Sequence, residues 1–232
     1  MATIILDGKK YSYSVVKKPI SSLRLRLQTN RSFIVSCPRL TPTFIINQFI
    51  KKNSNWIITH SLKITPKKSI KNLKSFSILD KKYQLVFINT SRDSVIIYPD
   101  KQIIYANISQ NTSSHIKQIL ETKLRPFALS LIKTELSSLK KQHNFNFGRV
   151  TVRNQTSRYG SCSSQGNLNF NWQIIFFPYP QFRHILLHEL THLKIKNHSK
   201  IFWDQLAIYD PNSKKHNLWL KKEGTKYFLF NK

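Results

Sequence analysis

Alternation of apolar and polar residues is the main signal in the first 110 residues. It is clearest at 23–27, where Leu-Arg-Leu-Arg-Leu places apolar side chains on one face and cations on the other. A period of two is typical of a half-buried β-strand. Similar segments, rich in β-branched and aromatic residues, occur at 33–36, 83–88, 94–98 and 102–105. The sequence therefore predicts a β-rich N-terminal region over residues 1–110.

One helix interrupts these strands. Between residues 42 and 60 the apolar side chains fall near helical spacing, and Thr41 or Thr43 can cap the N-terminus. The segment 63–75 is basic and polar, and we expect a loop there.

Helical periodicity dominates the rest of the chain. Apolar residues recur at intervals of three and four from 114 to 142, which predicts a long helix that Pro126 could kink or divide. The elements expected after it are a strand at 149–153, a hairpin of 157–163 and 167–173, and helices at 180–196, 199–209 and 213–227. We therefore expect an α+β chain, with a second domain over residues 111–232.

Basic residues far outnumber acidic ones. The chain has 38 Lys and Arg against 10 Asp and Glu, a formal charge of +28. Residues 1–110 carry +15 and residues 111–232 carry +13, so this division spreads the excess evenly. A nucleic-acid-binding arm would concentrate its cations in a block. The charge favours an anionic substrate or a weak electrostatic association with nucleic acid, without defining a reaction.

Composition also excludes several classes of protein. The five glycines have neither dinucleotide-binding nor P-loop spacing. Cys37 and Cys162 are too few for a disulfide framework or a Cys-based zinc ribbon. No apolar run approaches the ~20 residues of a membrane span, and the N-terminus does not resemble a secretory signal. We expect a cytoplasmic protein with no membrane partner, and the oligomeric state stays open.

The residues that suggest chemistry gather in one predicted helix. His188-Glu189-Leu190-Thr191-His192 has the pattern H-E-x-x-H. Four residues at about 100° each bring both histidines nearly onto one face, so that two imidazoles can bind one Zn²⁺ ion. Glu189 lies beside them, where it can take a proton from a zinc-bound water as a general base. The chain has only four glutamates, which makes this placement more informative.

A catalytic zinc site needs a third protein ligand. His198 follows His192 by six residues, and Asn197 before it can adopt a left-handed turn that returns the chain toward the metal. We expect His198 to be that ligand; the alternative is a surface histidine in a polar loop. His184 lies one turn before His188 on the same face, and either lines the cleft or is a partly exposed helix residue.

Four motifs resemble one known family. They are Arg158-Tyr159-Gly160-Ser161-Cys162-Ser163, then Leu168-Asn169-Phe170-Asn171-Trp172, then the H-E-x-x-H segment with Leu193, and then Asn197-His198-Ser199 with Phe202-Trp203. In order and spacing they resemble the YgjP-like metal-dependent hydrolases, bacterial relatives of the SprT-type minimal zincin metallopeptidases. Weaker similarities to the family occur in the N-terminal half at 24–26 and 55–57.

The resemblance implies a compact zincin-like metallopeptidase domain behind a β-rich N-terminal part. It implies zinc held by His188, His192 and His198, with Glu189 as the catalytic base. The chain departs from the family at two positions: Tyr159 stands where the family usually has Trp, and His184 where it has another aromatic residue. Both keep a bulky ring, so they concern the shape of the cleft and the substrate more than the metal chemistry.

Other side chains near the motifs have simple alternatives. Arg158 and Tyr159 could stabilise an oxyanion or bind a phosphate, or could be ordinary strand residues. Cys162 could be a nucleophile or a ligand, although a buried hairpin thiol is the simpler interpretation. Tyr209 could supply a phenol to the transition state.

The sequence thus predicts a zinc-dependent hydrolase, most simply a metallopeptidase acting on polypeptides. Two alternatives stay open. One is a nucleoside triphosphate pyrophosphatase at the same metal site, which the resemblance allows. The other is a basic protein associated with nucleic acid, whose zinc is structural.

Overall fold

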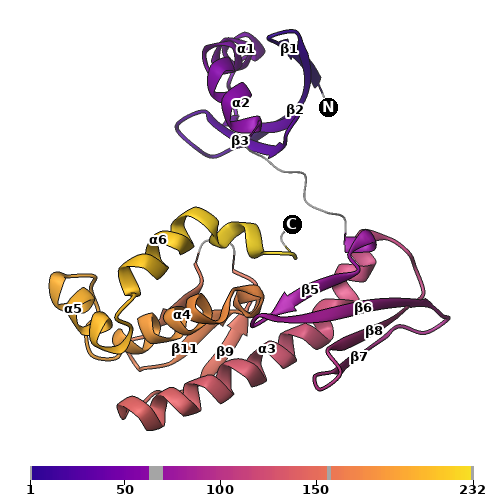
Figure 1. Cartoon of the computed structure of the whole chain (residues 1–232). Helices are drawn as coiled ribbons and strands as arrows, with labels where there is room; N and C mark the ends of the chain where they lie inside the picture. Colours follow the sequence, from indigo (N-terminus) through magenta and orange to yellow (C-terminus); the bar gives the residue numbers. More distant parts are fainter. Residues whose placement is uncertain (1, 63–69, 156–157, 231–232) are drawn as a thin grey trace. The chain divides into compact units, whose positions relative to one another are not determined.

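A computed structural model of the chain describes residues 2–62, 70–155 and 158–230 (Figure 1). It divides into two compact units, Met1–Lys68 and Ser69–Lys232. The division that we expected after residue 110 therefore lies much earlier. The reason is packing: the strands between 75 and 108 share one hydrophobic core with the helices that follow them.

Unit 1 is a four-stranded sheet with two helices. Its strands are β1 (Ala2–Leu6), β2 (Lys9–Lys18), β3 (Arg24–Thr29) and β4 (Ser32–Pro38), in the order β1–β2–β4–β3. β2 and β4 are parallel, and the other two pairs are antiparallel. β3 and β4 confirm the strands expected at 23–27 and 33–36, whereas β1 and β2 were not predicted.

The two faces of β3 follow the alternation in its sequence. Leu25 pairs with Val35 and Leu27 with Phe33, and both partners on β4 are fully buried. Arg24 and Arg26 are exposed. A period of two thus separates the core side of this strand from a cationic, solvent-facing side.

The helix expected over 42–60 is two helices, α1 (Thr43–Lys52) and α2 (Ser54–Ser61). Asn53 separates them with a backbone of φ −101° and ψ 15°, and its side-chain amide donates to the Phe49 carbonyl at 2.8 Å. Part of the predicted loop, 63–69, lies outside the described residues. In the remainder, Ile70–Asn72 form a 3-10 turn (η1), and Ser75 already begins a strand.

Unit 2 begins with a second four-stranded sheet. Its strands are β5 (Ser75–Ile78), β6 (Lys81–Asn89), β7 (Ser94–Tyr98) and β8 (Ile103–Ile108), in the order β5–β6–β8–β7. β6 and β8 are parallel, and the outer pairs are antiparallel. The predicted strands at 83–88, 94–98 and 102–105 are confirmed, and β5 is an addition.

A long helix, α3 (Ser113–His143), follows the sheet. It runs through Pro126 as a single helix, so the division that we considered there does not occur. The Thr112 side chain caps its N-terminus by accepting from the His115 backbone N–H. A buried stripe runs along it at helical spacing through Ile116, Ile119, Leu120, Leu124, Ala128, Ile132, Leu136 and Leu139.

The C-terminal part holds a small sheet and three helices. The sheet has β9 (Val150–Arg153), β10 (Gly160–Cys162) and β11 (Leu168–Asn171), in the order β10–β11–β9, and β10 and β11 form the predicted antiparallel hairpin. After a 3-10 segment, η2 (Trp172–Phe176), come α4 (Tyr179–Thr191), α5 (Lys200–Tyr209), α6 (Ser213–Glu223) and a last turn, η3 (Gly224–Tyr227). The fold is thus mixed α+β, with six α-helices and three sheets among the described residues.

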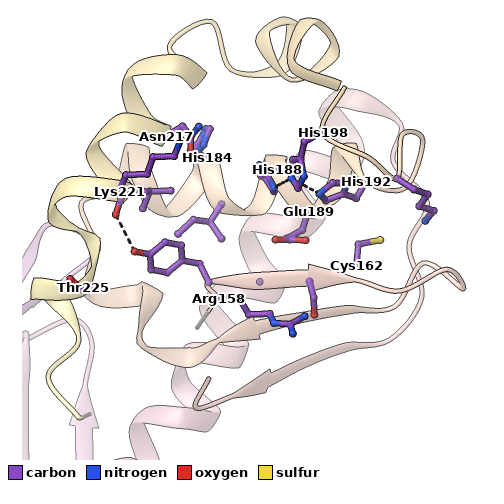
Figure 2. A pocket seen from close by; sticks show the side chains of 16 residues that line it. Arg158, Cys162, His184, His188, Glu189, His192, His198, Asn217, Lys221 and Thr225 are labelled. Carbon is purple, nitrogen blue, oxygen red and sulfur yellow. Dashed lines mark hydrogen bonds between the residues drawn. The ribbon is translucent and has the colours of Figure 1, made fainter. Parts of the chain in front are cut away.

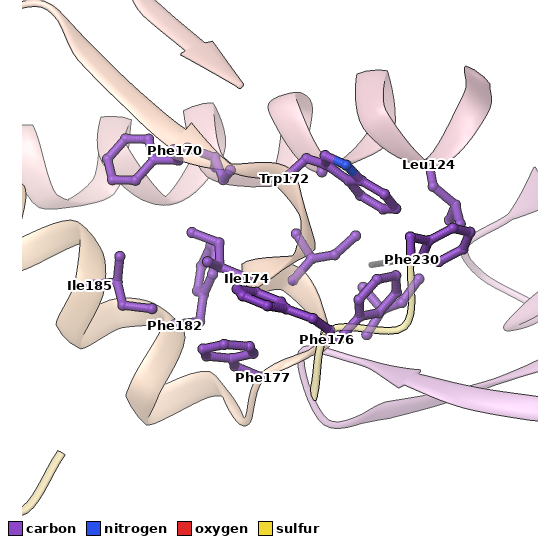
Figure 3. Packing of buried hydrophobic residues seen from close by; sticks show 14 of the residues in the cluster. Leu124, Phe170, Trp172, Ile174, Phe176, Phe177, Phe182, Ile185 and Phe230 are labelled. Atoms are coloured by element: carbon purple, nitrogen blue, oxygen red, sulfur yellow. The ribbon is translucent and has the colours of Figure 1, made fainter. Parts of the chain in front are cut away.

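Aromatic side chains fill the core between α3 and α4 (Figure 3). The rings of Phe176 and Phe230 stack at 5.8 Å, and Trp172 lies against both. Phe182 and Ile185 of α4 are buried in the same cluster. The helix that carries H-E-x-x-H is therefore fixed along its inner face by a close-packed core. In the described part of the chain, no helix is both long and apolar enough to cross a membrane.

Candidate metal centre

The end of α4 brings the predicted metal ligands together. His188 lies within the helix, and His192 is its C-cap residue. The backbone N–H groups of Leu193 and Lys194 bond to the carbonyls of Leu190 and Thr191, which closes the helix with a tight turn. The chain then returns, and His198 lies two residues before α5 begins.

Three imidazole nitrogens converge at this place (Figure 2). The His198 Nε2 atom lies 3.0 Å from the His188 Nε2 atom and 3.2 Å from the His192 Nε2 atom. The His192 Nδ1 atom lies 2.9 Å from the Ile195 carbonyl oxygen. Since a carbonyl only accepts, Nδ1 carries the proton, and the lone pair of Nε2 faces the other two rings. This donor set fits a divalent metal ion of the zinc type.

Phe202 on α5 contacts all three imidazole rings. Its ring lies 4.9 Å from that of His188, 4.5 Å from His192 and 4.8 Å from His198, measured between centroids. Phe202 is completely buried, so it has little freedom to move away. The imidazoles are therefore held in place by packing as well as by the backbone.

The electrostatic setting favours neutral imidazoles. Burial, together with the neighbouring His192 and His198, lowers the pKa of His188 to about 3. Burial also lowers the pKa of His192. Metal ions bind the neutral form of histidine, so these rings present the form that a metal needs at neutral pH.

Glu189 lies beside the three histidines and is 6% exposed. Burial raises the pKa of its carboxyl to about 7, and the positive charge of Arg158 opposes this shift. Gly160 on β10 gives the carboxyl its space: a Cβ atom there would lie 2.7 Å from the Glu189 Cγ atom and 2.8 Å from its Oε1 atom. A carboxyl with a pKa near neutrality is suited to accept and release protons.

The histidines and Glu189 line one pocket of about 650 Å³. Its walls come from β10, α4, the turn before α5, and α6. The cationic lining residues of the described chain are Arg158, Lys196 and Lys221, and Glu189 is the one carboxylate among the lining residues. The site therefore combines a candidate metal centre with a pocket that is rich in positive charge.

Other predicted residues are also placed. Arg158, Tyr159, Cys162 and His184 line the pocket. The Tyr159 hydroxyl donates to the Leu220 carbonyl at 3.1 Å, and burial raises the pKa of the Cys162 thiol, which disfavours a thiolate.

Tyr209 lies elsewhere. It is not among the residues that line the pocket, so the transition-state role that we considered for it stays a prediction that this geometry does not support. Its ring packs on His143 and Phe145, and its hydroxyl accepts from Lys194 at 3.1 Å.

Two residues that form a network with the pocket residue His184 were not predicted. Asp210 accepts from the His184 Nδ1 atom at 2.6 Å and from the His216 Nδ1 atom at 2.8 Å through the same oxygen. We had assigned no role to His216. The partners of Asp210 are separated from it by 26 and six positions, so no local sequence pattern indicates these contacts. The one available signal was the scarcity of acidic residues, since Asp210 is one of only ten.

Comparison with known protein families identifies the family to which this chain belongs. A profile described as the YgjP-like metallopeptidase domain matches residues 21–223. The chain belongs to the YgjP-like metallopeptidase family. The YgjP-like match begins between β2 and β3 in unit 1 and ends at the last residue of α6, so it includes residues of both units. Membership implies a metal-dependent peptidase that acts by hydrolysis, and the cluster of three histidines could hold the metal ion.

Solved structures offer more distant similarities to this YgjP-like chain. The metallopeptidase zymogen jannalysin of Methanocaldococcus jannaschii is 24% identical over 40% of this chain and 95% of its own, with a TM-score of 0.36. The metallopeptidase zymogen abylysin of Pyrococcus abyssi is 20% identical over the same shares, with a TM-score of 0.35. No curated protein matches the chain.

Proposed function

We propose that this protein is a zinc metallopeptidase in which His188, His192 and His198 hold the ion and Glu189 is the general base. The observation that carries the proposal is the convergence of three Nε2 atoms beside a buried carboxyl, within a metallopeptidase family. A bound zinc ion would supply Lewis-acid chemistry, polarising a water molecule and the peptide carbonyl.

The residues of the chain supply the remaining steps. Glu189 accepts a proton from the attacking water and delivers it to the leaving amine, a double role for which a pKa of about 7 is suited. Arg158 lines the same pocket, and its positive charge acts on Glu189. We assign it to stabilise the negative charge that develops on the carbonyl oxygen.

Glu189→Gln tests the general base. We expect unchanged zinc content, measured by metal analysis, and a 10²- to 10⁴-fold loss of casein hydrolysis, roughly the contribution of a positioned base. Glu121→Gln is the matched control, since Glu121 lies on α3 and pairs with Arg125. His198→Ala, in contrast, should lose zinc. Full activity of Glu189→Gln, or full zinc content in His198→Ala, would contradict the assignment.

The same assay separates peptidase from pyrophosphatase. Casein and nucleoside triphosphates are offered side by side to the zinc-loaded protein. Hydrolysis of the nucleotides alone, sensitive to Glu189→Gln, would assign the metal site to the alternative function.

A second candidate function is association with nucleic acid, and the position of the unit boundary favours it. Residues 1–68 contain 13 Lys and Arg but one acidic residue, Asp7, whereas residues 69–232 contain 25 and nine. Unit 1 therefore carries +12 on 68 residues and unit 2 +16 on 164. The cationic excess that looked even is concentrated in unit 1, where a nucleic-acid backbone would find the stronger positive field.

A further inference from the structure

One wall of the pocket carries polar groups that the proposed reaction does not use. Asn217 and Lys221 are four residues apart on α6, and both line the pocket. Residues at this spacing lie on the same side of a helix. Figure 2 shows both side chains with His184 toward α6, with Cys162 on the opposite side of the pocket.

Lys221 is one of two pocket cations, with Arg158, for which the described residues provide no hydrogen-bond or ion-pair partner. Arg158 acts electrostatically on Glu189, and the Lys196 Nζ atom donates to the Ser163 carbonyl at 3.3 Å. Among the described residues, neither Lys221 nor Asn217 has a hydrogen-bond or ion-pair partner. One ammonium and one amide are therefore available to a ligand from the same helix face.

A buried network holds this wall against α4. His184 is 1% exposed and lies one turn before His188, with 6.3 Å between the ring centroids. Its Nδ1 atom donates to Asp210, whose same oxygen accepts from His216 on α6. The other Asp210 oxygen accepts from the Asn212 backbone N–H at 3.1 Å. Asp210 thus joins α4, the end of α5 and the first turn of α6.

The protonation state of this network follows from its geometry. Burial works against ionisation of Asp210, but the hydrogen bonds from His184 and His216 outweigh it and keep the pKa of the carboxyl below its ordinary range. Asp210 is therefore a carboxylate whose acceptor sites are filled from inside the protein. Its oxygens are hydrogen-bonded to His184, His216 and the Asn212 backbone, so it does not compete for the ligand that Lys221 could bind.

We propose that Asn217 and Lys221 bind a carboxylate of the peptide substrate, and that Asp210 is the positioning residue that holds them beside the metal centre. The proposal rests on the proposed peptidase function and names its substrate class: peptides with a negative charge close to the cleaved bond. The carboxylate belongs either to an acidic side chain or to the C-terminus of the substrate.

Matched peptides test the specificity. One quenched fluorescent decapeptide is prepared with a single Asp moved through every position, with Asn at the same positions, and with either a free or an amidated C-terminus. For the zinc-loaded full chain we expect kcat/KM to be about tenfold higher for the carboxylate member of one pair, as for a hydrogen bond to a charged group. An advantage confined to one Asp position identifies a side-chain carboxylate; one confined to the free C-terminus identifies the terminal group.

Two neighbouring lysines provide the control. Lys221→Met should abolish the preference, so that the carboxylate peptide and its neutral partner are cleaved with equal kcat/KM. Lys222→Met removes the same charge from an exposed residue that does not line the pocket, and should keep the preference. Asp210→Asn should raise KM for the favoured peptide with little change in kcat, and Asp210→Glu should restore part of the preference.

These experiments distinguish failure of the proposed subsite from failure of the proposed peptidase function. If the wild-type protein cleaves no peptide at all, the proposed function fails. If it cleaves carboxylate and neutral peptides equally, or if Lys221→Met behaves like Lys222→Met, the proposed subsite is wrong while the peptidase stands. Zinc-loaded Glu189→Gln gives a readout without turnover: it should bind the favoured peptide more tightly than its neutral partner in calorimetry, and equal binding would overturn the subsite.

Discussion

Glu189 and Gly160 show how closely the reacting groups depend on their neighbours. The backbone of β10 passes so near the carboxyl that an added methyl group would contact both Cγ and Oε1. α4 is fixed by the aromatic core, so Glu189 rather than the helix must move. Position 160 therefore needs a residue without a side chain, because any Cβ atom there would displace the Glu189 carboxyl.

Gly160→Ala should reduce kcat for peptide hydrolysis about tenfold or more while zinc content stays complete, because a displacement of about 1 Å at a catalytic group is costly. Gly8→Ala is a useful comparison: it strains a turn at φ +67° in unit 1 but has nothing within 4 Å to displace. It should lower thermal stability without changing kcat. Wild-type turnover in Gly160→Ala would refute this account.

Phe202 is the residue on which the geometry of the three imidazoles depends. Phe202→Leu keeps an apolar side chain but removes the ring that stacks on His192 and makes T-shaped contacts with His188 and His198. We expect zinc affinity, measured by competition with a chelator, to fall about 10- to 100-fold, as for other residues that orient metal ligands. Phe182→Leu removes another fully buried ring of the same core, and should lose stability but keep zinc affinity. Similar affinities for both variants would contradict the prediction.

Individual residues differ in how far the sequence could define them. His188, Glu189 and His192 follow from the helical period, because their contact is local. His198 required a turn, which the structure provides. Asp210 and His216 meet His184 only after α5 and α6 have packed, so no local pattern contains that contact. Tyr209 is next to Asp210 in sequence, yet its side chain points to His143 and Phe145.

At the scale of elements, helix ends were the main uncertainty. α4 stops at Thr191 although helical periodicity continued to 196. The earlier stop is what lets the chain double back and bring His198 to the other two histidines. Similarly, Asn53 ends α1 by a hydrogen bond of its own side chain, a choice that apolar spacing does not reveal.

Asp210 links α4, α5 and α6. Its ionisation should therefore affect the free energy of unfolding. Its pKa is lowered in the fold, so the stability that it contributes is fully present above the carboxyl's ordinary pKa and is lost as pH falls through the lower, folded value. We expect metal-free Asp210→Asn to be about 1–3 kcal/mol less stable than wild type at pH 6–7, as for a lost hydrogen-bonded charge.

Urea unfolding measured from pH 7 to pH 3 checks this, and the difference between the two proteins should narrow below about pH 4. Asp204→Asn, an exposed position on the same helix α5, should match wild type throughout. A difference for Asp210→Asn that persists unchanged to pH 3 would show that its charge is not the cause.

At the scale of the whole molecule, the boundary between the units changed the interpretation of charge. A division at 110 made the cations look like a uniform background, because it combined the basic N-terminus with residues 69–110, which carry a net charge of only +3. Which strands share a core depends on tertiary packing, and the alternating pattern is the same in both sheets. Fold class was therefore predictable, and the unit boundary was not.

The uneven charge predicts where nucleic acid would bind. Arg24→Gln with Arg26→Gln removes two exposed cations from unit 1, and Lys214→Gln with Lys215→Gln removes two from unit 2. If unit 1 makes the contacts, the first pair should reduce the salt dependence of binding to a DNA duplex, with a slope smaller by up to about 2, and the second pair should leave it unchanged. Equal effects of both pairs would show that the charge acts diffusely.

Metal binding by the three histidines would also affect how well the chain between α4 and α5 is ordered. His188 and His192 lie at the end of α4, and His198 lies just before α5, with five residues between the last two. A bound ion would act as a cross-link across this very short loop. A cross-link stabilises a fold by removing conformational entropy from the unfolded chain, and this effect grows with the length of the closed loop. For so short a loop the stabilisation is small. The ion would then order the entry into α5 more than it would raise the free energy of unfolding through chain entropy.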